Sequence, residues 1–203
     1  MEIHLHQGDL PDGIDLGDTI AVDTETRGLH LTRDRLCLIQ LSAGDGVCHL
    51  VQFKAGEYDA PNLRAQLGDP KRLKLMQYGR FDIAVIENHL GALAMPVYCT
   101  KIASKLVRTY TDKHGLASLC RELLGVDLSK QQQSSDWAAD DLTEAQLAYA
   151  ASDVLYLHRL KEKLDVMLIR EKRMELAQSC FDFLPTRSRL DTMGWGEMDI
   201  FHH

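Results

Sequence analysis

The sequence lacks the features of a membrane, exported or zinc-finger protein. No run approaches the roughly 18 apolar residues of a membrane-spanning helix. Residues 1–14 carry acidic and polar side chains where a signal peptide has a basic and then an apolar segment. The five cysteines are scattered, odd in number, and without a C-x-x-C pair or a histidine at zinc-finger spacing. We therefore expect a soluble, cytoplasmic protein with reduced cysteines and no contact with a membrane.

Positive charge is also scarce. The chain has 23 lysine and arginine residues against 30 acidic residues, which gives a net charge of -7. The field of the whole protein should repel a long polyanion. Any contact with nucleic acid must therefore be local or mediated by metal ions.

Length and composition favour one α/β domain, because 203 residues with 45% hydrophobic content fall short of the length that usually splits in two. We expect residues 1–180 to form this domain. Residues 181–203 are rich in glycine, aromatic and charged residues and show no periodicity. They are expected to form a C-terminal tail that packs against the core or forms a subunit interface.

Along the chain, hydrophobic patterns predict strands first, then strands and helices in alternation, and then helices alone. Strands are expected at residues 19–22, 36–41, 47–53, 73–76 and 96–99. Helices are expected at residues 62–67, 80–90, 100–108, 116–124, 144–163 and 164–178. Short connections should make the first three strands an antiparallel meander. This order predicts an α/β fold in which a mixed five-stranded sheet is flanked by helices.

Two carboxylates end the first strand. Asp23 and Glu25 are two residues apart, so both side chains should point to the same face. Neighbouring carboxylates repel each other and neither is easily buried. An isolated Asp-x-Glu is more often a solvated strand end or a helix cap, so this pair alone is weak evidence for a site.

Two further acids follow on helices. Asp82 lies in the first turn of a predicted helix. Its alternative explanation is structural, because an acid there can cap the helix and interact favourably with the helix dipole. Tyr149 and Asp153 are four residues apart and share one helix face. A solvated helix face would explain Asp153, although its apolar neighbours leave less room for that explanation.

Taken together, these acids resemble the DEDDy exonucleases, the ribonuclease D-like branch of the RNase H-like superfamily. The resemblance covers roughly residues 19–160 and rests on five motifs in family order. They are Val-Asp-Thr-Glu-Thr at 22–26, Leu-Ile-Gln-Leu-Ser at 38–42, Thr-Lys-Ile-Ala-Ser at 100–104, Ser-Asp-Trp at 135–137 and Tyr-Ala-Ala-Ser-Asp-Val at 149–154. The sequence departs from the family at Gln77, where histidine is frequent, and at residues 140–141, where an Arg-Pro pair is common.

The resemblance implies a metal-dependent 3′-to-5′ exonuclease. Asp23 would bridge two divalent ions, Glu25 and Asp153 would hold the ion that carries the attacking water, and Asp82 would reach the second ion. Oxygen ligands of this kind favour Mg²⁺ or Mn²⁺ over zinc. Tyr149 would hydrogen-bond the attacking water, and orientation is a safer role than base catalysis for a phenol with a reference pKa near 10.

The resemblance also suggests substrate contacts. Thr26 and Leu29 stand where the family contacts the 3′-terminal nucleotide, with Leu29 as a wedge between bases or, equally well, as ordinary core. Further candidates for phosphate and sugar contact are Lys130, Gln133, Ser135 and Trp137. Trp137 is alternatively a packing anchor for the preceding loop. The dispersed bases Lys101, Lys105, Arg108 and Lys113 are expected to form a solvated helix face.

Within this superfamily, the single domain and residues 130–137 look most like the bacterial nanoRNase C family, whose members form rings and degrade diribonucleotides. The resemblance therefore implies short RNA as substrate and a homo-oligomeric ring as assembly. A DNA-trimming or tRNA-processing exonuclease on the same fold is the alternative within the enzyme class. A catalytically silent RNase H-like scaffold is the alternative outside it, although all four acids and the tyrosine are present.

Overall fold

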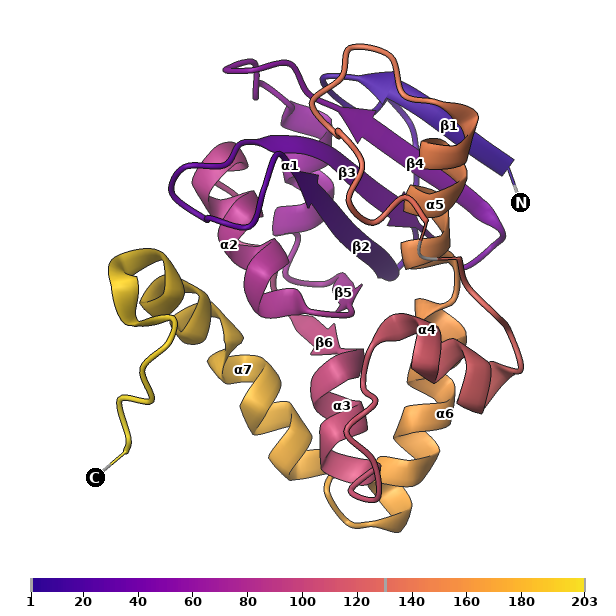
Figure 1. Ribbon diagram of the computed structural model, residues 1–203, viewed down its shortest axis with the longest axis vertical. Helices are drawn as coiled ribbons and strands as arrows, with labels where there is room; N and C mark the ends of the chain where they lie inside the picture. The colour runs from indigo at the N-terminus through magenta and orange to yellow at the C-terminus, as the bar shows by residue number, and fades with distance from the viewer. Residues whose placement is uncertain (1, 130, 203) are drawn as a thin grey trace.

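The computed structural model describes residues 2–129 and 131–202, and its centre is one mixed sheet (Figure 1). The strands are β1 (Glu2–Gln7), β2 (Thr19–Thr26), β3 (Leu36–Ser42), β4 (Val47–Gln52), β5 (Leu73–Met76) and β6 (Val97–Cys99). Their order across the sheet is β1-β4-β3-β2-β5-β6. β2, β3 and β4 form the expected antiparallel meander, while β5 and β6 continue parallel to β2.

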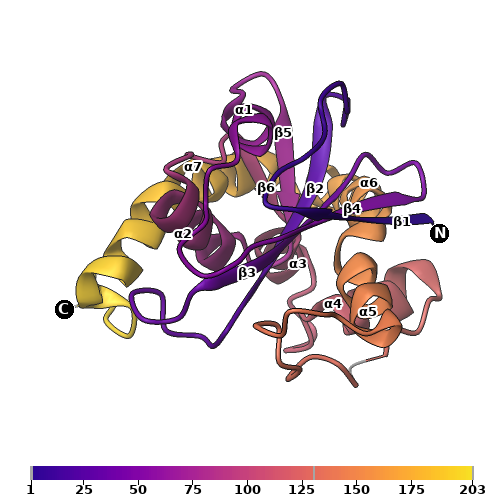
Figure 2. The ribbon, with the colours of Figure 1, turned by 90° about the horizontal axis from the view of Figure 1, so that it is seen from above.

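Helices cover both faces of this sheet. They are α1 (Pro61–Gly68), α2 (Gly79–Leu90), α3 (Thr100–Val107), α4 (Leu116–Leu119), α5 (Glu144–Leu155), α6 (Leu157–Arg170) and α7 (Met174–Leu190). Single π-helical turns follow α4 at Cys120–Leu124 and α7 at Asp191–Trp195. Figure 2 shows α1 and α2 on one side of the sheet and α4 and α5 on the other. The predicted mixed sheet flanked by helices is confirmed.

The core lies between the sheet and these two helical layers. β3 is buried along its whole length and packs against α5, and its apolar side chains belong to the same core as the buried residues of α2 and α6. Burial of such surfaces supplies the main driving force for the fold. Among the described residues, every helix is too short or too polar to span a membrane.

The predicted count of five strands is wrong, because β1 adds a sixth at the edge. β1 pairs in parallel with β4, from Glu2 opposite Val47 to Gln7 opposite Gln52. Its residues are mostly polar and half-exposed, and its partner lies about 45 residues away in the chain. A short polar segment of this kind carries no strand signal until its partner is known.

The helical boundaries near the C-terminus also differ from the prediction. The helix expected at residues 144–163 breaks at Tyr156, and the one expected at 164–178 is replaced by the second half of α6 and by α7. α7 continues to Leu190 with Pro185 inside it, so the expected tail begins as a helix. Phe181 and Leu184 of this helix are buried in the core.

Candidate active site

The site begins at the C-terminal end of β2. Alternation along this strand turns Asp23 and Glu25 toward α5, and turns Thr24 toward α2. β2 pairs with β3 through Asp23 opposite Gln40 and Glu25 opposite Leu38, and the register shifts between Glu25 and Thr26. A shift of this kind increases the local twist at the end of the strand.

α5 brings a third acid to the same place. A capping box between Thr143 and Gln146 starts this helix, with the Thr143 hydroxyl accepting from the Gln146 backbone and the Gln146 side chain accepting from the Thr143 backbone. Asp153 lies nine residues beyond Glu144, the first residue of α5. Carboxylate oxygens of Asp23, Glu25 and Asp153 all lie within 4.8 Å of one another.

Asp82 approaches from the opposite helical layer, in the first turn of α2. It is 3% exposed, and the Thr24 hydroxyl donates to its Oδ1 at 2.7 Å. Thr24 therefore ties α2 to the strand that carries Asp23 and Glu25. The structure places Asp82 close enough to affect the titration of the other acids, but outside the compact group of three.

Burial raises the pKa of all four acids, and neighbouring carboxylates raise those of Asp23, Glu25 and Asp153 further. Burial and then the charges of Asp82, Asp153 and Glu25 hold the pKa of Asp23 well above its ordinary value. Burial and neighbouring carboxylates raise the pKa of Glu25 to about 9. Burial raises the pKa of Asp82 to about 7, and burial with the charge of Asp82 raises that of Asp153 to about 7. Such an arrangement is unfavourable without a compensating positive charge.

The donor set fits a hard divalent cation. Three carboxylate oxygens converge at ligand distance from one another, and the group contains no thiolate or imidazole. Oxygen-only sites of this kind suit Mg²⁺ or Mn²⁺. A bound cation would also remove the mutual repulsion of the acids.

The raised pKa values make the metal-free protein sensitive to pH. In the unfolded chain these carboxyls ionise near about pH 4, whereas the metal-free fold retains their protons to higher pH. Because the folded state then binds more protons than the unfolded chain, the free energy of unfolding falls as pH rises through this window.

We therefore expect the melting temperature of chelator-treated protein to fall by about 5 °C between about pH 6.5 and 8.5. Glu25→Gln should reduce this slope, because Glu25, with a pKa of about 9, keeps its proton in the metal-free fold across the interval while the unfolded chain has lost it. Scanning calorimetry of both proteins checks this. A metal-free wild type whose stability does not change, or a slope that Glu25→Gln leaves intact, would contradict it.

Tyr149 lies beside the acids on α5. Burial, followed by the charges of Asp153, Glu25 and Asp23, raises its pKa. The phenol therefore remains protonated and able to donate a hydrogen bond at neutral pH. Its ring packs at 6.1 Å from that of Trp137.

Three of the predicted substrate residues lie in clearly different surroundings. Leu29 is 86% exposed on the loop between β2 and β3, so the alternative that it is ordinary core is wrong. Gln133 lines a cleft of about 140 Å³ together with Tyr149 and Asp153. Trp137 is 3% exposed, which supports its alternative role as a packing anchor.

The remaining substrate candidates make local contacts or lie outside the description. The Thr26 hydroxyl donates to the Gly28 carbonyl, which shapes the start of the loop that carries Leu29. The Ser135 hydroxyl donates to Gln132 Oε1 at 2.6 Å. Lys130 lies outside the described residues.

Sequence reasoning missed the wall of the cleft and misread one arginine. The segment from Gly115 to Ser118, at the start of α4, lines the cleft together with Tyr149 and Asp153. The glycine before this helix was the available signal. Arg108 was expected on a solvated face, but it is fully buried and donates to Ser104 Oγ at 3.0 Å and to the Lys113 carbonyl at 2.7 Å, besides its ion pair with Glu122.

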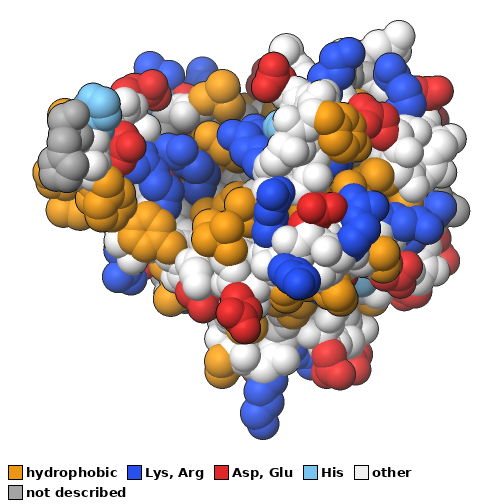
Figure 3. All heavy atoms as spheres, turned by 90° about the horizontal axis from the view of Figure 1, so that it is seen from below, with side chains coloured by type: hydrophobic (Ala, Val, Ile, Leu, Met, Phe, Trp, Pro, Cys, Tyr) orange, Lys and Arg blue, Asp and Glu red, His pale blue; other side chains and the backbone are white. Residues whose placement is uncertain are grey.

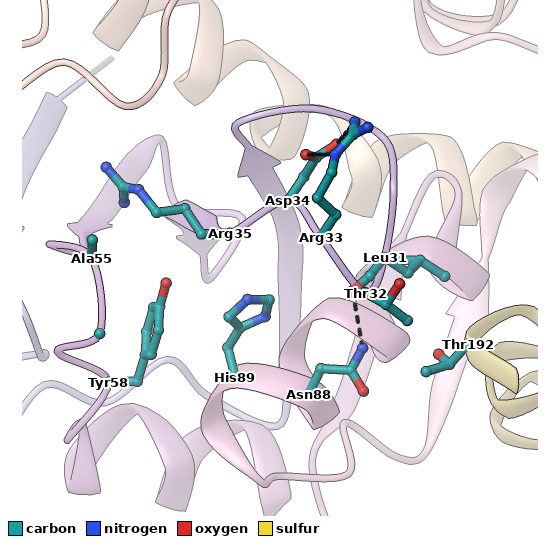
Figure 4. A pocket seen from close by; sticks show the side chains of 11 residues that line it. Leu31, Thr32, Arg33, Asp34, Arg35, Ala55, Tyr58, Asn88, His89 and Thr192 are labelled. Atoms are coloured by element: carbon teal, nitrogen blue, oxygen red, sulfur yellow. Dashed lines mark hydrogen bonds and ion pairs between the residues drawn. The ribbon is translucent and has the colours of Figure 1, made fainter.

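Residues 31–35, in the loop that carries Leu29, line a larger pocket of about 510 Å³ (Figure 4). Its main polar groups are already bonded to protein. The Tyr58 hydroxyl donates to the Leu36 carbonyl at 3.2 Å, and the Leu36 amide donates to His89 Nε2 at 3.3 Å. Asn88 donates to the Leu31 carbonyl at 3.4 Å. These hydrogen bonds tie the loop to α2 and to Tyr58.

Comparisons with known proteins agree with a site built on the four acids. A family model described as 3′-5′ exonuclease matches residues 13–169, which include all four acids. The chain is 37% identical to ribonuclease D of Escherichia coli (strain K12) over 72% of this chain and 38% of that protein. It is 32% identical to ribonuclease D of Gluconacetobacter diazotrophicus over 79% of this chain and 40% of that protein. The chain thus spans about two fifths of the length of these curated relatives.

Among solved structures, Brucella melitensis NrnC is similar over the whole chain. It is 56% identical, with a TM-score of 0.97, and the match covers 100% of this chain and 98% of that one. Structures of the same protein bound to pGG and with bound Mg²⁺ match with TM-scores of 0.97 and 0.95.

Proposed function

The chain belongs to the 3′-5′ exonuclease family, and from this membership we propose that it hydrolyses short oligoribonucleotides, diribonucleotides above all, to nucleoside 5′-monophosphates. Two divalent ions, Mg²⁺ or Mn²⁺, would serve as cofactors. The observation that carries the proposal is the group of carboxylate oxygens from Asp23, Glu25 and Asp153 within 4.8 Å of one another. The Brucella relative with bound Mg²⁺ supports the choice of metal.

Each residue of the site has a defined task in this proposal. Asp23, Glu25 and Asp153, together with Asp82, would hold the ions. When bound, such ions neutralise charge on the scissile phosphate and lower the pKa of the attacking water. The phenolic oxygen of Tyr149 would accept a hydrogen bond from this water and so orient it, since a phenol with a reference pKa near 10 is neutral at neutral pH. The exposed Leu29 side chain packs against the 3′-terminal base.

Three features support a short substrate. The cleft beside Tyr149 and Asp153 measures about 140 Å³, which suits a terminal nucleotide better than a folded RNA. The net charge of -7 disfavours capture of long polyanions. The Brucella relative binds pGG, which supports the same conclusion.

We further propose a homo-oligomer, in the form of a closed ring, in which residues 181–203 contribute to the subunit interface. Large apolar side chains at this end are exposed, namely Phe183, Met193, Trp195, Met198, Ile200 and Phe201. Figure 3 shows hydrophobic side chains gathered at the left of the view, where the C-terminal segment lies. An exposed apolar patch of this kind is typical of an interface.

A cytoplasmic location is part of the same proposal. Cys37, Cys48, Cys99, Cys120 and Cys180 are all free in the structure, and four of them are buried. Free thiols are usual in a reducing compartment.

Substrate length and assembly provide the test. Specificity constants for RNAs of two, three, five and twenty nucleotides, and for matching DNAs, should be highest for the diribonucleotide. Light scattering should show an oligomer that Met193→Asp and Phe201→Asp weaken, since these side chains are 69% and 67% exposed. Val166→Asp is the matched control, because Val166 is 67% exposed on α6, away from the C-terminal segment.

The alternative functions predict other results. Preference for DNA or for the longest RNA would favour a trimming exonuclease. Absence of hydrolysis with every substrate would favour a silent scaffold. A monomer that prefers the twenty-nucleotide RNA would refute both the short substrate and the ring.

A further inference from the structure

Gln40, in the middle of β3, has a side chain that is buried without hydrogen-bond partners. It is 0% exposed, and within the described part of the chain neither its Nε2 nor its Oε1 makes a hydrogen bond. A buried amide without partners is destabilising, and native proteins rarely retain one without a reason.

The sheet register places Gln40 beside the acidic site. Gln40 lies directly opposite Asp23 in the antiparallel pair of β2 and β3. Directly opposed residues point to the same face, with Cβ atoms about 4.5–5.5 Å apart. Gln40 therefore shares the face that carries Asp23 and Glu25, and α5, which supplies Asp153, packs over this face.

Gln52 shows that an amide on this face normally has partners. It lies opposite Leu38 on β4, on the same face as Gln40. Its Nε2 donates to the Ala139 and Asp140 carbonyls at 2.9 and 3.1 Å, and its Oε1 accepts from Gln7 at 2.9 Å. The unpaired state of Gln40 is therefore a property of its position beside Asp23 and not of the face as a whole.

We propose that Gln40 is a positioning residue for the metal site, whose Nε2 donates a hydrogen bond to the Asp23 carboxylate when a divalent ion is bound. The proposal rests on the metal site of the proposed function. A carboxylate that binds an ion through one lone pair keeps others that accept hydrogen bonds. Donors of this kind fix the orientation of the ligand, and their loss typically weakens metal binding by about 10–100-fold.

This arrangement predicts two effects of opposite sign in Gln40→Met, which keeps the size of the side chain and removes both polar atoms. Without metal, the variant should melt about 2–4 °C higher than the wild type, because an unpaired buried amide is gone. Its affinity for Mn²⁺ should fall by about 10–100-fold. A residue with a purely structural role would not show this combination.

The test is calorimetric titration of Mn²⁺ without substrate, combined with melting curves in chelator. The matched control is Gln52→Met, which loses bonded contacts and should therefore melt lower while its affinity for Mn²⁺ stays within about twofold of the wild type. Equal affinity of Gln40→Met and the wild type, or a lower metal-free melting temperature of Gln40→Met, would overturn the proposal. Failure of the wild type to bind Mn²⁺ would instead refute the metal site itself.

Discussion

Asp23→Asn is expected to lower the rate of RNA hydrolysis by about 10³-fold or more, while the metal-free variant melts at a higher temperature than the wild type. The amide keeps the shape of the carboxylate but removes the charge that holds a divalent ion, and such ions contribute several kcal/mol to transition-state stabilisation. Stability should increase because the metal-free fold no longer has to keep a carboxyl protonated at this position, beside Glu25 and Asp153, whose oxygens lie within 4.8 Å.

Single-turnover rates with Mg²⁺ and melting curves in chelator measure both effects. Glu25→Gln, Asp82→Asn and Asp153→Asn should each also nearly abolish hydrolysis. Asp18→Asn is the matched control, because Asp18 is exposed just before β2, and this variant should keep the wild-type rate. Wild-type turnover in any of the four site variants would reject the role of that residue.

Tyr149→Phe is expected to lower the chemical rate by about 10²-fold or more, the scale of a lost positioning or proton-transfer group. The change deletes one hydroxyl and leaves the ring in its packing position beside Trp137. Substrate affinity should therefore change little.

Single-turnover kinetics separate this effect from binding. Tyr156→Phe serves as the control, since Tyr156 lies one residue beyond α5 and outside the cleft lining. Loss of rate in Tyr149→Phe alone supports the role in orienting water. A full single-turnover rate in Tyr149→Phe would show that Tyr149 serves only in packing.

The predicted membership of the ribonuclease D-like 3′-5′ exonuclease family and the predicted RNase H-like fold are confirmed by the family match and by the structural similarity to Brucella NrnC. Local sequence signals were enough to predict an element whose ends are marked by residues of its own segment. The strand at residues 73–76 was predicted with its observed bounds, and α2 ends before Gly91, whose φ of 65° needs glycine. β1 could not be predicted, because its pairing with β4 is non-local.

The site was only partly readable from the sequence. The spacing of Asp23 and Glu25 fixes a shared face, but convergence with Asp153 depends on how α5 packs over β2. The exposure of Leu29 and the burial of Trp137 follow from tertiary packing, which no local pattern encodes. The position of Gln40 beside Asp23 depends on the strand register.

The most direct test of the metal-dependent exonuclease is incubation of the purified protein with a 5′-labelled diribonucleotide in Mg²⁺ and in chelator. We expect labelled nucleoside 5′-monophosphate to appear with Mg²⁺, no product in chelator, and recovery when Mn²⁺ is added, because the carboxylate group holds hard divalent ions. Hydrolysis that continues in chelator, or wild-type protein that leaves the diribonucleotide intact in Mg²⁺, would contradict the account.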